Sequence, residues 1–243
     1  MEKTLMQKAT IFSTEFDFTS GEQKEILHYL QVNNYRLLGY KGASGPNQVS
    51  SGVPTWFSMP YVNMFGRFEI YFEPRYKVYV FNKGDITINT TITMHALSDE
   101  VSLGTKVVFN TDGSFHSDSV GSEEVITVYN SRPAGTSPIT IGLAVKVNGQ
   151  FLPFCAFTCA AQGTVSIQPD AKIALFAAQS NMTSGSVADH IINPGCSFMW
   201  NAKNTMFDLQ MIPETYGIEN VPGRLSVEPV SPGSSLLQLF NIF

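Results

Sequence analysis

Short runs of aromatic and β-branched residues, each closed by turn residues, most constrain how this chain of 243 residues can fold. Residues 68–72 and 76–80 are two such runs, separated by Glu73, Pro74 and Arg75. In residues 85–94 apolar side chains alternate with hydroxyl and amide side chains. A period of two residues is typical of half-buried strands. The sequence therefore predicts strands in all three segments.

Turn residues divide the rest of the chain in the same way. Asp112-Gly113 and Asn148-Gly149 are typical of tight hairpin turns. Eight to ten strands at short spacing, with glycine and proline between them, favour an all-β fold, an antiparallel β-sandwich with one or two short helices on its flank. The further strand segments are 107–110, 125–129, 139–147, 151–159, 172–178 and 198–211.

The chain divides into three parts by its pattern. Residues 1–34 form an N-terminal segment with a short helix, because Ser20 precedes the apolar residues Ile26, Leu27 and Leu30 at helical spacing. Residues 35–211 form the β-sandwich domain. Residues 212–243, rich in proline, glycine and serine, read as an extended C-terminal tail that packs on its own domain or on a neighbouring subunit.

Composition excludes several classes of protein. Charged residues make up 14% of the chain, hydrophobic residues 43% and aromatic residues 12%, which is unlike a disordered chain or a coiled coil. The chain has no run of about 18 apolar residues that would predict a spanning helix. Residues 1–10 lack the pattern of a secretory signal peptide. We expect a soluble protein, one that acts outside the cell if it is a toxin, with reduced cysteines.

Signatures of catalysis are missing from the sequence. There is no phosphate-binding glycine loop, no dinucleotide fingerprint and no nucleophile elbow. The four histidines stand singly, and Cys155 has no basic neighbour in the sequence that would activate it as a nucleophile. We therefore expect a protein that is not an enzyme and that holds no metal or cofactor.

Residues 35–83 differ from the rest of the chain. They contain 12 of the 29 aromatic residues, and six basic residues against two acidic ones. Aromatic side chains among cations are favoured at the headgroup level of a membrane surface. An alternative interpretation is that these aromatic residues fill the core while lysine and arginine lie on the outer face of the strands.

Within this segment, residues 57–65 read Phe-Ser-Met-Pro-Tyr-Val-Asn-Met-Phe, followed by the aromatic run 67–71. This resembles the lipid-headgroup segment of the actinoporins, pore-forming cytolysins with a β-sandwich fold. The resemblance implies a phosphocholine pocket lined by Ser58, Pro60, Tyr61 and, more loosely, Phe65, with tyrosine rings around the quaternary ammonium. The candidate headgroup-binding residues are Trp56, Ser58, Pro60, Tyr61, Phe65, Tyr71, Tyr76 and Tyr79.

Three hypotheses for function follow. The leading one is a protein that binds membrane lipid headgroups and oligomerises into a pore, lined by an N-terminal helix or by hairpins such as one containing residues 85–94. The second is a carbohydrate-binding, lectin-like module for glycans. The third is a structural jelly-roll subunit of a shell or fibre. The first and third imply a homo-oligomer. A net charge of −5 argues against nucleic-acid binding.

Overall fold

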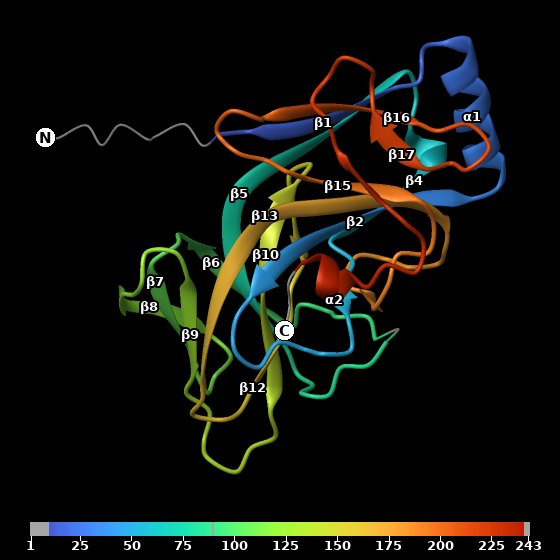
Figure 1. The fold of residues 1–243 in the computed structure, drawn as a ribbon. Coiled ribbons are helices and arrows are strands. Elements are labelled where there is room, and N and C mark those ends of the chain that lie inside the picture. Colours follow the sequence, from blue (N-terminus) through green and yellow to red (C-terminus); the bar gives the residue numbers. More distant parts are fainter. Residues whose placement is uncertain (1–9, 89, 241–243) are drawn as a thin grey trace, which may run out of the picture.

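Two β-sheets packed face to face make up most of the computed structural model, which describes residues 10–88 and 90–240 (Figure 1). Within these residues no helix is both long and apolar enough to cross a bilayer. Residues 1–9, which belong to the segment predicted to lack a signal peptide, lie outside the described residues. The predicted all-β sandwich is confirmed.

Sheet A has the strand order β11-β10-β5-β1-β16-β17, with β12 also paired to β10 and β6 to β5. Its strands are β1 (Phe12–Asp17), β5 (Arg67–Phe81), β6 (Ala96–Val101), β10 (Ile139–Val147), β11 (Gln150–Pro153), β12 (Phe157–Cys159), β16 (Met206–Met211) and β17 (Ile218–Asn220).

Sheet B has the order β18-β15-β13-β9-β7-β8, with β2 paired to β13 and β4 to β2. Its strands are β2 (Tyr35–Ser44), β4 (Phe57–Pro60), β7 (Thr105–Phe109), β8 (Phe115–Val120), β9 (Ile126–Asn130), β13 (Thr164–Gln179), β15 (Gly195–Met199) and β18 (Glu228–Val230). The short strands β3 (Val53–Pro54) and β14 (Val187–Ala188) form a separate ribbon, and the helices are α1 (Gly21–Val32), η1 (Tyr61–Asn63) and α2 (Leu236–Leu239).

The described residues contain more strands than the sequence predicts, and two pairs of neighbours, β1 with β16 and β7 with β9, run parallel. The N-terminal segment supplies the predicted helix and also β1, which lies between β5 and β16 in the middle of sheet A. The predicted hairpin at Asn148-Gly149 is confirmed, because β10 and β11 pair on either side of it and both turn residues have positive φ.

The two aromatic runs on either side of Pro74 form one strand instead of two. β5 is continuous for 15 residues, and its pairing with β10 shifts register between Glu73 and Tyr76. Proline has no N–H to donate to a ladder, so it is tolerated in a strand at such a bulge. The bulge lets β5 bend along the whole sandwich (Figure 1).

The strand predicted over residues 85–94 is wrong. Residues 85–88 and 90–94 form a loop, in which the Thr87 N–H donates to Thr90 Oγ1 and the Thr90 N–H donates to the Thr87 carbonyl, both at 3.1 Å. This turn interrupts the extended backbone. Ile86 and Ile92 are buried nonetheless, in a small cluster beside the main core. The alternating apolar and polar residues of this segment therefore belong to a loop that is anchored by two buried isoleucines.

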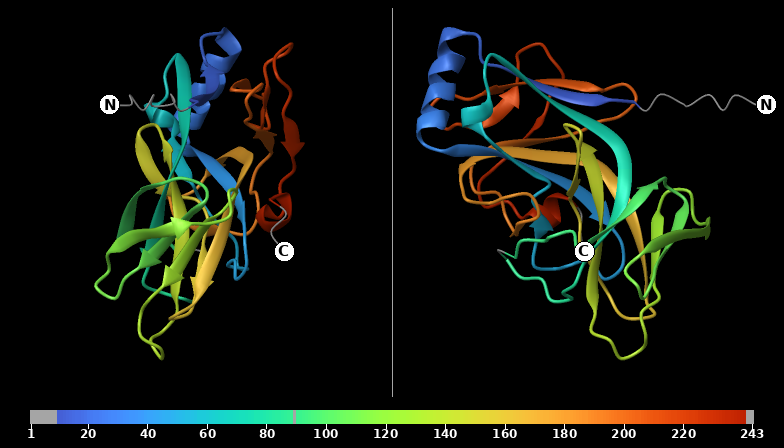
Figure 2. Two further views of the ribbon diagram at one scale, coloured as in Figure 1. Left: turned by 90° about the vertical axis from the view of Figure 1, so that its left-hand side faces the viewer. Right: turned by 180° about the vertical axis from the view of Figure 1, so that it is seen from behind.

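The C-terminal segment packs on its own chain up to residue 240, the last that the structure describes. β17 belongs to sheet A and β18 to sheet B. Leu236 and Phe240 are buried in one cluster with Leu38, Tyr40 and Phe176. In the left view of Figure 2 this segment covers the outer side of sheet B. The predicted tail is therefore a part of the sandwich. Within the described residues it has no extended stretch that leaves the domain.

The interior between the sheets contains one lysine. Lys41, on β2, is 1% exposed, and its Nζ donates to the backbone carbonyl of Asp170. It also lies 5.2 Å from the ring centroid of Phe72 and 5.7 Å from that of Phe154. Burial lowers the pKa of this ammonium to about 8.

Candidate functional site

The eight residues predicted to bind headgroups do not share one surface. Phe65 is 71% exposed on the loop after η1, and Tyr71 is 47% exposed on the outer face of β5. The other six lie inside the fold or at its margin. Trp56, Tyr61, Tyr76 and Tyr79 are buried, whereas Ser58 and Pro60 are half-buried.

The buried members of the set are fixed by contacts in the core. The indole N–H of Trp56 donates to the Val145 carbonyl at 3.4 Å, and the Tyr79 hydroxyl donates to the Cys155 carbonyl at 2.7 Å. Burial also raises the pKa of Tyr76 to about 12. Trp56, Tyr61 and Tyr76 pack in the main core and Tyr79 packs in the smaller cluster beside it, so these rings are not available as a cage around a ligand in this conformation.

The Ser58 hydroxyl is also engaged within the protein. It accepts from Arg36 Nε at 2.6 Å and donates to the Met182 carbonyl at 2.7 Å, while Arg36 Nη2 donates to the Ser58 carbonyl at 3.0 Å. Arg36 thus ties β2 to β4, and Ser58 ties β4 to the loop that contains Met182. A headgroup would have to replace these hydrogen bonds to reach Ser58.

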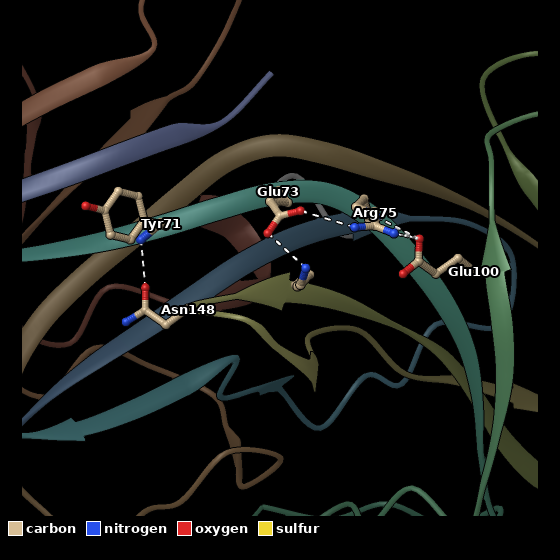
Figure 3. Close-up of polar contacts among 6 residues, drawn as sticks. Tyr71, Glu73, Arg75, Glu100 and Asn148 are labelled. Carbon is tan, nitrogen blue, oxygen red and sulfur yellow. Dashed lines mark hydrogen bonds and ion pairs between the residues drawn. The ribbon is translucent and has the colours of Figure 1, made fainter. Parts of the chain in front are cut away.

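Two of the six basic residues of segment 35–83, Arg67 and Arg75, pair with acidic residues from other parts of the fold. On the outer face of β5, Arg75 donates to Glu100 at 2.7 Å, and Glu73 pairs with Lys146 at 3.0 Å (Figure 3). The Lys146 ammonium lowers the pKa of the Glu73 carboxyl below its ordinary value. The positive charge of the segment is therefore balanced by distant acidic residues at Arg67 and Arg75.

Tyr71 lies beside this charged row. Its backbone N–H donates to Asn148 Oδ1 at 2.7 Å, which links β5 to the β10–β11 turn (Figure 3). Its hydroxyl donates to the Glu69 carboxylate at 2.7 Å, and this hydrogen bond raises the pKa of Tyr71. Tyr71 thus belongs to a solvated polar surface, apart from Phe65.

The exposed apolar side chains of the segment lie on residues 61–66, which we call the tip loop. Tyr61 and Met64 point into the core, whereas Val62 and Phe65 are 57% and 71% exposed. The two buried residues are three positions apart, and so are the two exposed ones. This spacing is the sequence signal that distinguishes the buried pair from the exposed pair. A Cβ added to Gly66 would meet no atom within 4 Å, so the loop ends in open solvent.

The tip loop is held in place by α1 and β1. Gln31 Nε2 donates to the carbonyls of Tyr61 at 3.3 Å and of Met64 at 3.0 Å. The Phe18 N–H, just after β1, donates to the Gly66 carbonyl at 2.8 Å. Val32, the last residue of α1 and 64% exposed, lies next to Gln31. Three apolar side chains are therefore presented to solvent from a fixed backbone.

Three tyrosines gather on another side of α1, at the same end of the molecule. The rings of Tyr29 and Tyr216 stack with centroids 4.4 Å apart, and Tyr35 lies 6.1 Å from Tyr29 and 5.9 Å from Tyr216. Tyr216 has a φ of 53°, a strained conformation for a tyrosine. Sequence reasoning missed this cluster because its members come from α1, β2 and the turn after β16.

The charges around this end are of mixed sign. Arg67, which follows the tip loop, pairs with Asp17 at 3.2 Å. Exposed Lys24 is flanked on α1 by exposed Glu22 and Glu25. This end of the molecule therefore has apolar side chains on a surface that favours neither anions nor cations strongly.

The three cysteines of the chain all lie within the described residues. All three cysteines are buried thiols, and burial raises the pKa of Cys155 to about 12 and of Cys159 to about 11. In the same part of the chain, three or more His, Cys, Asp and Glu side chains are nowhere grouped to hold a metal ion. The exposed apolar end described above is the feature that best fits an interaction.

Comparison with protein families, with curated proteins and with solved structures finds no match to this chain.

Proposed function

We propose that this protein attaches to membrane surfaces through the tip loop, with Val62 and Phe65 entering the headgroup region beside Val32. The observation that carries the proposal is the pair of exposed apolar side chains on a loop fixed by Gln31 and Phe18. Apolar side chains that gather on one part of a surface mark interaction sites, and Val32, Val62 and Phe65 are exposed on α1 and the tip loop that it holds. The tip loop projects from the molecule and does not form a groove. A projecting loop can enter the fluid headgroup region of a membrane.

The tyrosine cluster and the balanced charge support the same proposal. Tyrosine rings are enriched at the headgroup level, where one end of the ring is apolar and the other is hydrated. Ion pairing of Arg67 with Asp17 leaves little net attraction for anionic lipid. We therefore expect attachment to zwitterionic phosphocholine lipids, with little dependence on anionic lipid.

Attachment by the tip loop does not require α1 to leave the sandwich. Gln23 on α1 exchanges two hydrogen bonds with the Met211 backbone, at 2.8 and 3.0 Å, and Ile26, Leu27 and Leu30 are buried. Insertion of this helix into a bilayer would break all of these contacts. Pore formation is thus a second step beyond attachment, and dye release from vesicles measures it separately.

The test is flotation with vesicles of phosphatidylcholine, with and without sphingomyelin. Phe65→Asp should weaken binding roughly 10- to 100-fold, because burying one large apolar side chain contributes about 1.5–3 kcal/mol. Val120→Asp, at an 89% exposed position on β8, is the matched control and should bind as the unchanged chain does.

Two results would contradict the proposal. The first is that the unchanged chain does not float with either vesicle. The second is that Ser58→Ala abolishes binding while Phe65→Asp does not, since that outcome points to the headgroup pocket implied by the actinoporin resemblance.

A further inference from the structure

A polar pocket of about 250 Å³ lies at one end of sheet B, where β13, β15 and β18 meet. Cys196 and Phe198 point from β15 into the main core, so alternation places Ser197 and Met199 on the opposite face of this strand. The residues of the pocket that carry the argument are Lys172, Ser197, Met199, Asn201, Asn204 and Glu228.

A hydroxyl and an ammonium group meet at one carboxylate oxygen of the pocket. Ser197, which is 0% exposed, has its Oγ 3.4 Å from Glu228 Oε2, and Lys172 Nζ lies 3.7 Å from the same oxygen. Both distances are longer than those of strong hydrogen bonds to a carboxylate. Lys172 and Glu228, whose side chains are 22% and 77% exposed, therefore retain hydrogen-bonding capacity for a further partner.

Two carboxamides line the pocket in the turn after β15. Asn201 Oδ1 accepts from the N–H groups of Lys203 at 2.9 Å and Asn204 at 3.0 Å, which fixes the side chain and leaves its amino group without a partner among the described residues. The Asn204 side chain likewise makes no hydrogen bond within the part of the chain that the structure describes. Both amides are available to a ligand.

The pocket thus combines one ammonium, one carboxylate, two carboxamides and a buried hydroxyl, and its formal charge is zero. Met199, 55% exposed, adds an apolar surface beside them. A neutral pyranose offers several hydroxyls and one apolar ring face, and a volume of this size suits a single ring. We propose that this pocket binds a neutral sugar, as a free monosaccharide or at the end of a glycan.

This site is separate from the tip loop. The Ser13 N–H, at the start of β1, donates to the Thr205 carbonyl in the turn next to the pocket, whereas the tip loop is bound to Phe18 beyond the other end of β1. The sugar proposal therefore does not rest on membrane attachment, and each is tested without the other.

The experiment is a glycan array followed by calorimetric titration of the full chain with glucose, galactose, mannose, N-acetylglucosamine and sialic acid. We expect binding of at least one neutral sugar, weakened roughly tenfold or more by Glu228→Gln and by Asn204→Ala. The first variant replaces a charged acceptor oxygen by an amino donor, and the second removes a carboxamide. Glu100→Gln is the matched control, because it makes the same change at a carboxylate paired with Arg75 on the other sheet. Phe65→Asp should also bind sugar normally.

Three outcomes would overturn the proposal. One is the absence of binding by every neutral sugar, on the array and up to about 50 mM in titration, where even weak sites are occupied. Another is binding that persists in both pocket variants. The third is binding of sialic acid alone, which a pocket with balanced charge does not explain. Urea unfolding of each variant shows whether a loss of binding comes from the pocket or from the fold.

Discussion

At the scale of single residues, Lys41 is the least expected member of the core. This buried ammonium is stabilised by the Asp170 carbonyl, by the faces of two phenylalanine rings and by the negative charge of the Asp170 carboxylate. Its desolvation costs more than these contacts return, which is why its pKa falls to about 8. Because the pKa of an unfolded lysine is about 10.4, the unfolded chain binds this proton more tightly.

We predict that Lys41→Met raises the free energy of unfolding by roughly 1–3 kcal/mol at pH 7. Between about pH 8 and pH 10.5 this lysine is protonated in the unfolded chain and largely neutral in the folded one. The free energy of unfolding of the unchanged chain therefore increases as pH rises through this window. The advantage of the variant should therefore shrink over this window. Urea unfolding of both proteins at pH 7 and pH 10 measures the difference, and a gap that does not change with pH would contradict the argument.

For the candidate headgroup residues, the sequence alone does not determine which side chains are buried and which are exposed. The sequence indicates that Tyr61 and Phe65 belong to one aromatic segment, but not that one faces the core and the other faces solvent. That choice depends on α1, which covers Tyr61 and leaves Phe65 open. Likewise the acidic partners of Arg67 and Arg75, Asp17 and Glu100, lie far from them in the sequence.

At the scale of elements, the contact between β10 and β5 depends on a residue without a side chain. A Cβ on Gly142 would lie 2.0 Å from the Cys155 carbonyl oxygen and 2.5 Å from the Tyr79 hydroxyl oxygen. Such distances force backbone or core side chains to move.

We predict that Gly142→Ala lowers the free energy of unfolding by about 2 kcal/mol or more. Gly21→Ala is the matched control at the start of α1, where an added Cβ meets no atom within 4 Å. It should be neutral or stabilise the chain by up to about 1 kcal/mol, because alanine favours the helix. Thermal unfolding of the two variants compares them directly, and equal midpoints would show that β10 can shift away from β5.

Elements with local signals were predicted well from the sequence. The helix after Ser20 and the Asn148-Gly149 hairpin each depend on a few neighbouring residues, and both are present. Residues 85–94 were misjudged because alternation does not distinguish a strand from a loop with two buried anchors, Ile86 and Ile92. β1 was missed because its six residues acquire strand partners only from β5 and β16.

At the scale of the whole molecule, the C-terminal segment closes the outer side of sheet B. Leu236 and Phe240 lie against Leu38, Tyr40 and Phe176, none of which is more than 2% exposed. Removing this cover would leave an apolar face in contact with water.

We predict that Leu236→Asp lowers the free energy of unfolding by about 2–4 kcal/mol and promotes self-association, because it buries an unpaired charge in this face. Leu225→Asp, at a 40% exposed position of the same segment, should have little effect. Urea unfolding and sedimentation velocity test both expectations. If Leu236→Asp is as stable as the unchanged chain, the segment does not belong to the cooperative fold.

The central place of β1 in sheet A also sets an order of events during protein synthesis. A ribosome makes β1 roughly 190 residues before β16, although the two strands are neighbours. Until β16 has left the exit tunnel, one edge of β1 has no partner and sheet A stays open. Sheet A can close only after β16 has been made, and a nascent chain stalled before residue 206 would carry an unprotected strand edge.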